Sequence, residues 1–583
     1  MKTEFTGALE KPRNGLAGLK HWRHDLLAGL LVSLISLPFS LGIAVASGAP
    51  PIAGLLSAII AGLILPFLGG SYVTVSGPAA GLAPALLVAM TVLGRGNLKT
   101  GYPLLLGVIC LTGAVQVVLS KLKAARFCTF FPSVVVEGML ASIGLMIIAK
   151  QLPHLIGHEF KFHEFFSMLA ETPSQLRQTE PKVLVLGMVC LVLVFSLGSL
   201  KARWLKVVPS QVLVVGIGII LARLLQLDSR YLIHIPDDPF KHGIVLPNFQ
   251  GLIADRSLWL SVVTAVITLT LIDGVESLAT IAAIDRIDPF RRKSDPDRTL
   301  FAMGVSNICS SMAGGLTIIP GGVKSTACIQ GGGRTQWANF YNACFLLIFL
   351  FVGRGLINLI PFSALAAILI FTGYKLCRPS VWRHTAAIGS EQLLLFGTTV
   401  IATLATDLLW GIMIGTSAKM LMTLVFELRA GVLPIRAATP LGLATGTVGG
   451  VADLFRNPVV DRELIDGAYH LYLGRPLVCF NTLQLSKELE NIPTEAENVY
   501  LHLEDGVSII DHTACDNLTY FTEEFESQGN RKLEVLGMDR MQMRSDHPSC
   551  MRLGTPVLVV ASGDGPRLLE VVDDLGVQMG EID

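Results

Sequence analysis

Three polar stretches, two of them glycine-rich, lie in a chain that is otherwise strongly apolar. They are SYVTVSGPAAGLAP (71–84), LTLIDGVESLAT (269–280) and GGLTIIPGGVKSTA (314–327). In hydrocarbon, unpaired backbone groups and charges are costly, and a helix that faced lipid throughout would exclude most of these residues. We therefore expect the three stretches to line a binding site.

The first stretch predicts the start of a half-helix at Ser76, Gly77 and Pro78. Serine is a favoured helix cap, proline fits the first helical turn, and the small Ala79 and Ala80 let a ligand approach the backbone. Free N–H groups and the positive end of the helix dipole would then face an anion. The alternative is a glycine–proline kink in an ordinary spanning helix.

The third stretch predicts a second half-helix. Gly321 and Gly322 precede a short helix that should begin near Val323, with Lys324 and Ser325 in its first turn. A lysine in hydrocarbon is costly unless it faces a partner or a wet cavity, so we expect Lys324 to bind an anion. The alternative is that its side chain extends to the cytoplasmic interface.

Acidic residues in the second stretch share one face of a helix. Asp273, Glu276 and Thr280 are spaced i, i+3 and i+7. Two carboxylates in a span favour a face that lines a cavity. Glu276 with Thr280 could coordinate Na⁺, could bind a proton, or could neutralise Lys324, and the residues alone leave these three open.

The composition indicates an integral membrane protein with a soluble C-terminal part. Of the 583 residues, 51% are hydrophobic and 15% charged. No Asp, Glu, Lys or Arg occurs in the 69 residues from Leu26 to Gly94, which is enough for three spans. From Asp461 onward, 23 acidic residues face 9 basic ones, which is typical of a soluble acidic domain.

The apolar runs fall into two sets of seven, at about 26–227 and about 258–430, and the third run of each set is short and glycine-rich. Matching short segments are typical of inverted-repeat transporters, whose site lies between two half-helices near the midplane. We predict an α-helical polytopic protein of fourteen segments, with a cytoplasmic segment at 1–25 and a transport domain at 26–430.

The C-terminal part predicts a small α/β domain, because strand-like runs alternate there with amphipathic helical patterns. We assign 431–464 to a linker and 465–583 to this domain with its C-terminal extension, in which 556–576 should add a strand and a helix. Lys and Arg concentrate in loops on the side that holds both termini, which favours cytoplasmic termini in a plasma (inner) membrane.

Several of these stretches, in chain order, resemble the SulP anion-transporter family with its STAS domain: LPFSLGIAVASGAPPIAGLLSAIIAG, VSGP, ESLAT, PGGVKSTA and VSIIDHTACDNLTYF. The resemblance covers nearly the whole chain. It implies fourteen segments in two inverted repeats, a core and a gate domain, a homodimer, and substrates such as sulfate, bicarbonate, chloride or dicarboxylates.

The resemblance also implies residue roles. VSGP with the two following alanines matches the anion-binding half-helix of the third span, and GGVKS that of the tenth, with Lys324 where many members have Arg. Glu276 and Thr280 match the acid and threonine that serve a coupling Na⁺ in bicarbonate-transporting members. Phe39 stands where many members have Gln, and Val323 where many have Ser, so the anion site should be drier.

We therefore expect secondary active transport of a small inorganic oxyanion, bicarbonate or sulfate, in symport with Na⁺ or H⁺. The alternatives are an uncoupled anion exchanger or channel, and a membrane sensor or scaffold that binds a cytoplasmic protein through the STAS domain. The expected partners are the anion, the lipid bilayer and a second copy of the chain, with no nucleic acid. No P-loop spacing occurs, and we expect no enzymatic activity and no cofactor besides a possible Na⁺.

Overall fold

The computed structural model describes residues 11–570, except 126–130, 159, 161–164, 176–178, 200–208, 236–243, 407, 430–453, 466, 494–495, 497, 505, 527–530, 555–556 and 563–564. The chain divides into two compact units. The first unit comprises Met1–Cys128, Leu140–Cys377 and Leu404–Leu409, and the second comprises Thr129–Met139, Arg378–Thr403 and Trp410–Asp583.

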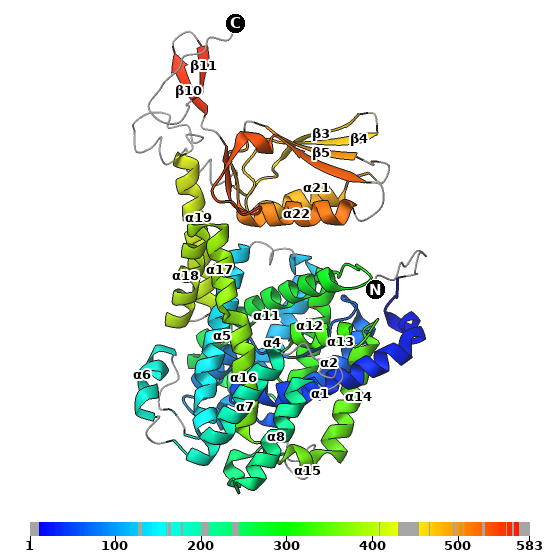
Figure 1. Ribbon diagram of the computed structural model, residues 1–583, viewed down its shortest axis with the longest axis vertical. Coiled ribbons are helices and arrows are strands. Elements are labelled where there is room, and N and C mark those ends of the chain that lie inside the picture. Colours follow the sequence, from blue (N-terminus) through cyan, green and yellow to red (C-terminus); the bar gives the residue numbers. More distant parts are fainter. Residues whose placement is uncertain are drawn as a thin grey trace. The chain divides into compact units, whose positions relative to one another are not determined.

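Fourteen helices in the described part of the chain correspond to the fourteen predicted segments (Figure 1): α1 (Trp22–Ala46), α2 (Pro51–Leu68), α3 (Ala83–Leu93), α4 (Leu98–Lys121), α5 (Ser133–Ile156), α7 (Pro181–Ser199), α8 (Ser210–Leu224), α11 (Trp259–Ile287), α12 (Pro296–Met312), α13 (Gly322–Gln330), α14 (Trp337–Val352), α16 (Phe362–Cys377), α18 (Ser390–Ala405) and α19 (Leu408–Arg429). Among the described residues, eight helical stretches are long and apolar enough to cross a membrane. The predicted polytopic helical fold is confirmed.

Helices of the first repeat pack against helices of the second in two equivalent contacts. Helix α4 of the first repeat packs against α12 of the second, as α2 packs against α14. At the first contact the backbones nearly touch: a Cβ on Gly113 would lie 2.6 Å from the carbonyl oxygen of Gly304, and a Cβ on Gly304 would lie 2.7 Å from that of Gly113. Only glycine at both positions permits this approach.

Local capping sets where α12 begins. Asp295 precedes the helix, and its carboxylate accepts a hydrogen bond from the Arg298 N–H at 3.0 Å. Pro296 occupies the first helical position, where its missing N–H costs nothing. Helix α12 carries Asn307, which contacts both α4 and α11.

The second unit contains the C-terminal domain together with α17 (Pro379–Ile388), α18, most of α19 and the start of α5. Its main sheet has the order β3-β4-β5-β7, formed by β3 (Val459–Ile465), β4 (Ala468–Leu473), β5 (Asn498–Leu503) and β7 (Lys532–Leu536). Strand β3 is antiparallel to β4, and the other neighbours are parallel. The predicted α/β fold is confirmed.

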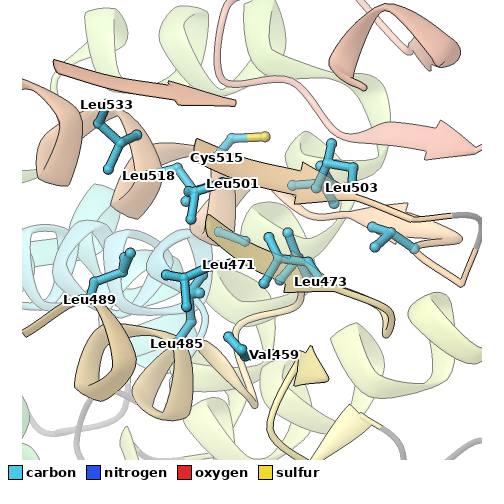
Figure 2. Packing of buried hydrophobic residues seen from close by; sticks show 14 of the residues in the cluster. Val459, Leu471, Leu473, Leu485, Leu489, Leu501, Leu503, Cys515, Leu518 and Leu533 are labelled. Atoms are coloured by element: carbon cyan, nitrogen blue, oxygen red, sulfur yellow. The ribbon is translucent and has the colours of Figure 1, made fainter. Parts of the chain in front are cut away.

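Helices α21 (Thr482–Glu490) and α22 (His512–Glu526) cover one face of this sheet. Figure 2 shows leucines of the strands and of both helices pointing into a common core, among them Leu471, Leu501 and Leu518. Helix α22 begins after Asp511, whose carboxylate accepts a hydrogen bond from the Ala514 N–H at 2.8 Å. This is a conventional N-terminal cap.

Two boundaries in the C-terminal part differ from expectation. Strand β3 lies within the predicted linker 431–464, most of which falls outside the described residues. The helix expected after the strand in 556–576 is wrong, because β10 (Val557–Ser562) and β11 (Gly565–Glu570) form an antiparallel hairpin.

Candidate anion site

The two glycine-rich stretches meet as a pair of short antiparallel strands in the first unit. Strand β1 (Ser76–Pro78) pairs with β2 (Ile318–Pro320). Next to this pair, the Gly321 N–H donates to the Val75 carbonyl at 2.9 Å, and the Val75 N–H donates to Ser325 Oγ at 2.9 Å. Each strand leads into a short helix, α3 or α13, so the corresponding parts of both repeats lie together as predicted.

Helix α3 begins later than the sequence predicts. Ser76–Pro78 is extended, and the helix starts only at Ala83, with Pro84 in its first turn. The prediction that Ser76 caps the half-helix is therefore wrong. The reason is the pairing with β2, which satisfies backbone groups of this segment across the pair and removes the need for a helical turn.

Both short helices have N termini without a side-chain cap. Helix α13 begins at Gly322, close to the predicted start at Val323. The residue before each helix, Gly321 for α13 and Leu82 for α3, makes no side-chain hydrogen bond to the helix. Gly322 and Val323 are exposed. The first N–H groups of a helix have no acceptor within it and carry partial positive charge, so an open N terminus can bind an anion.

Lys324 places a buried amine beside β1. Its side chain is 4% exposed, and its Nζ has no hydrogen-bond partner among the described residues. A Cβ built on Gly77 would collide with this nitrogen, so the amine fills the space that a side chain at position 77 would take. The alternative that Lys324 extends to the interface does not fit this position, and a buried ammonium without a partner favours an anionic ligand.

The carboxylate of Glu276 lies against the same segment, four residues further along. A Cβ on Gly81 would collide with this carboxylate. Its Oε2 is buried without a hydrogen-bond partner in the described part of the chain. Lys324 and Glu276 therefore do not neutralise each other, and the segment from Gly77 to Gly81 separates two opposite charges.

Thr280 lies one turn after Glu276 on α11 and reaches the start of α13. It is half-buried, and its Cγ2 is 4.0 Å from where a Cβ on Gly322 would be. The face of α11 that carries Glu276 and Thr280 thus touches the beginnings of both half-helices. The predicted spacing on one helical face brings these two residues to the site.

Asp273 lies in a separate cluster of hydrogen bonds. It is fully buried, its Oδ1 accepts from Ser277 Oγ at 3.0 Å, and its Oδ2 accepts from Asn307 Nδ2 at 3.0 Å. Both carboxylate oxygens are therefore already engaged, in contrast to Oε2 of Glu276.

The remaining predicted site residues differ in their burial and in the hydrogen bonds of their side chains. Ser76 Oγ is buried without a hydrogen-bond partner, whereas Ser325 Oγ is used to hold the backbone, donating to the Gly321 carbonyl at 2.7 Å. Ala79 is buried and Ala80 half-buried. Phe39 is buried in α1, a helix that packs against β1, α3 and α13.

Two polar residues near the site do not stand out in the sequence. Lys150 donates from Nζ to the Pro84 carbonyl at 3.4 Å, in the first turn of α3. A lysine at the end of an apolar run resembles a span boundary, yet α5 continues to Ile156, and the apolar residues after Lys150 are the signal that could have revealed it. Asn307 lies in a serine-rich segment of α12, and its role depends on partners far away in sequence.

Paired half-helices within two packed repeats define the class of secondary transporters with an inverted-repeat fold. The chain matches the sequence profile of the Sulfate permease family over residues 22–399. It belongs to this family. The C-terminal sheet with its helices is compatible with a STAS domain.

Relatives with assigned functions are transporters rather than enzymes. The bicarbonate transporter BicA of Picosynechococcus is 23% identical over 416 residues, which cover 69% of this chain and 70% of the relative. The probable sulfate transporter Rv1739c of Mycobacterium tuberculosis is 24% identical over 521 residues, which cover 88% of each chain. The protein is therefore a multi-pass membrane protein of an anion-transporter family, and its substrate class is small inorganic anions.

Solved structures share the fold. The transmembrane domain of a cyanobacterial bicarbonate transporter BicA aligns with a TM-score of 0.62 and 21% identity, covering 69% of this chain and 100% of that one. The murine Slc26a9 anion transporter in its inward-facing state aligns with a TM-score of 0.61 and 17% identity, covering 88% of this chain and 85% of that one.

Proposed function

We propose that the protein is a secondary active transporter of a small oxyanion, bicarbonate or sulfate, coupled to Na⁺ or H⁺. The observation that carries the proposal is a pair of buried, opposite charges, Lys324 Nζ beside Gly77 and Glu276 Oε2 beside Gly81. Neither atom has a hydrogen-bond partner in the part of the chain that the structure describes. Charged groups buried in a membrane protein are retained where they bind something, and each of these two lacks the partner that would neutralise it.

The anion would bind to Lys324 and to the free N–H groups at the starts of α3 and α13. Backbone donors at a helix N terminus point along the axis and suit the oxygens of an oxyanion. With Phe39 and Val323 apolar, the main chain and one lysine supply most of the recognition, and Ser76 Oγ adds one hydroxyl.

The coupling cation would bind at Glu276, with Thr280 as a second oxygen ligand if the cation is Na⁺. An anion at Lys324 and a cation at Glu276 attract each other across the segment from Gly77 to Gly81, so loading one favours loading the other. Glu276 alone binds a proton in the H⁺-coupled version.

Transport would proceed by alternating access, in which a core domain that carries both half-helices rocks against a gate domain. The protein would act as a homodimer in the plasma (inner) membrane, with both termini in the cytoplasm. The excess of Lys and Arg in the loops on one side supports this orientation.

Uptake into proteoliposomes tests the function. Labelled bicarbonate and sulfate are supplied with and without an inward Na⁺ gradient or pH gradient, and coupled transport gives accumulation only with the appropriate gradient. Glu276→Gln should remove the dependence on the gradient before it removes anion binding. Equal uptake under all gradients contradicts coupling, and currents that persist without any cation gradient indicate a channel.

A further inference from the structure

A buried amide cluster connects four elements of the first unit. Asn307 of α12 is fully buried. Its Nδ2 donates to Asp273 Oδ2 on α11 at 3.0 Å and to Gln116 Oε1 on α4 at 2.9 Å, and its Oδ1 accepts from the Ile318 N–H of β2 at 2.6 Å.

The chemistry of its partners fixes the orientation of this amide. The Ile318 N–H can only donate, so the Asn307 oxygen must face β2, and the –NH₂ group must then face Asp273 and Gln116. Asp273 and Asn307 are therefore complementary acceptor and donor, and Ser277 supplies the second donor to Asp273.

This cluster connects the two elements that lead to Lys324 and to Glu276. Ile318 opens β2, which pairs with β1 and leads through Gly321 to Lys324. Asp273 lies on α11, one turn before Glu276. One side chain thus joins the strand that positions Lys324 to the helix that carries Glu276.

We infer that Asn307 is a positioning residue that, together with Asp273, holds β2 against α11 so that Lys324 and Glu276 serve one site. Asp273 then acts as the acceptor of this clamp and does not ligate the coupling ion. The inference rests on the proposed anion and cation sites, and it assigns Asp273 and Glu276 of α11 to different tasks.

An exchange of the two side chains tests the clamp. Asn307→Asp places two carboxylates together, so this single change breaks the donor–acceptor match. Asp273→Asn alone keeps an amide oxygen that accepts from Asn307, so it disturbs the match much less. The double variant Asp273→Asn/Asn307→Asp restores it, because a carboxylate at position 307 still accepts from the Ile318 N–H and from the new amide. Gln116 can then offer its Nε2, which has no hydrogen-bond partner among the described residues.

The readout is KM for the anion in proteoliposomes under a fixed cation gradient, together with the dependence of uptake on that gradient. Asn307→Asp should raise KM by about tenfold or more, as expected for coupled neighbours, with gradient dependence kept, and Asp273→Asn should raise it less. The double variant should return to within about threefold of the unmodified protein. Ser306→Ala is the matched control: Ser306 Oγ is buried in the same helix without a hydrogen-bond partner in the described structure, so KM should not change.

The outcomes separate this inference from the proposed function. A KM in the double variant as high as in Asn307→Asp, or an unchanged KM in folded Asn307→Asp, overturns the clamp. If a single variant does not fold, the double variant decides, because a functional clamp requires it to fold and to recover the anion KM. Absence of saturable, gradient-dependent uptake in the unmodified protein instead overturns the proposed function.

Discussion

Residue 77 is glycine because the amine of Lys324 occupies the place of its side chain. We expect Gly77→Ala to displace the amine and to raise the KM for anion uptake by about tenfold or more, since a hydrogen bond to a charged group contributes about 1.5–3 kcal/mol. Gly216→Ala in α8 is the control, because no atom of the described structure lies within 4 Å of where its Cβ would be. Equal losses in both variants would contradict the role of Lys324.

The same reasoning at Gly81 addresses the cation. A methyl group there would displace the Glu276 carboxylate, so Gly81→Ala should weaken the dependence of uptake on the Na⁺ or pH gradient more than it changes anion binding. Comparing uptake with and without the gradient in Gly77→Ala and Gly81→Ala measures the two effects separately. If both variants lose the same property, the two charges do not serve separate ligands.

These residue roles were only partly predictable from sequence. Lys324 and Glu276 stand out because a charge in an apolar segment is conspicuous on its own. Lys150 resembled a span boundary and Asn307 an ordinary polar residue, because their significance lies in contacts with Pro84 and with Asp273, which no local pattern encodes.

At the scale of elements, the start of α13 was predicted to within a residue and that of α3 was not. The glycines before α13 end the strand directly at the helix, whereas β1 and α3 are separated by a turn at Ala80–Leu82. Strand pairing between β1 and β2 is a long-range contact, so the order of strand, turn and helix could not be read from the local VSGP pattern.

Strands β4 and β5 carry a pair of histidines that should make the C-terminal domain sensitive to acid. His470 Nδ1 and His502 Nε2 lie 2.9 Å apart, and burial together with His470 lowers the pKa of His502 below its ordinary value of 6.5. The unfolded domain then binds a proton more readily than the folded one. Above about pH 6.5 this histidine does not lower the free energy of unfolding of the domain. The free energy of unfolding falls as the pH drops through that value towards the pKa of His502 in the folded state.

Hydrogen exchange of the β4 and β5 amides in the full-length protein measures this effect. Exchange, corrected for its intrinsic pH dependence, should be faster at about pH 5.5 than at about pH 7.5. His470→Gln removes the neighbouring imidazole and should reduce the difference. Protection that is the same at both pH values would contradict a lowered pKa for His502.

At the scale of the whole molecule, the second unit joins the C-terminal domain to α19 through a buried ion pair. Lys419 Nζ is 3.3 Å from Asp511 Oδ2, and the two side chains are 2% and 0% exposed. Asp511 also accepts from the Cys479 N–H at 2.9 Å, and Thr513 shares a hydrogen bond of 3.1 Å with Ser133. The turn that opens α22 is thus engaged by residues of α5 and α19.

Lys419→Met should destabilise the second unit by about 3–5 kcal/mol, because it leaves the buried Asp511 carboxylate without its counter-ion. Thermal unfolding of the purified protein in detergent measures the change. The control is Lys532→Met, which removes an ion pair with Glu534 whose side chains are 66% and 45% exposed, and should cost less than about 1 kcal/mol. Similar effects of both variants would contradict the importance of burial.

The separation of Lys324 from Glu276 has an electrical consequence. In the proposed cycle the empty site carries one positive and one negative charge, so it is neutral. Bicarbonate with one Na⁺ or H⁺ keeps it neutral, whereas sulfate with one cation leaves one net negative charge to cross the membrane. A potential of 100 mV changes the energy of that step by about 2.3 kcal/mol. The rate of bicarbonate uptake into proteoliposomes should therefore not depend on an imposed membrane potential, whereas the rate of sulfate uptake should change with it.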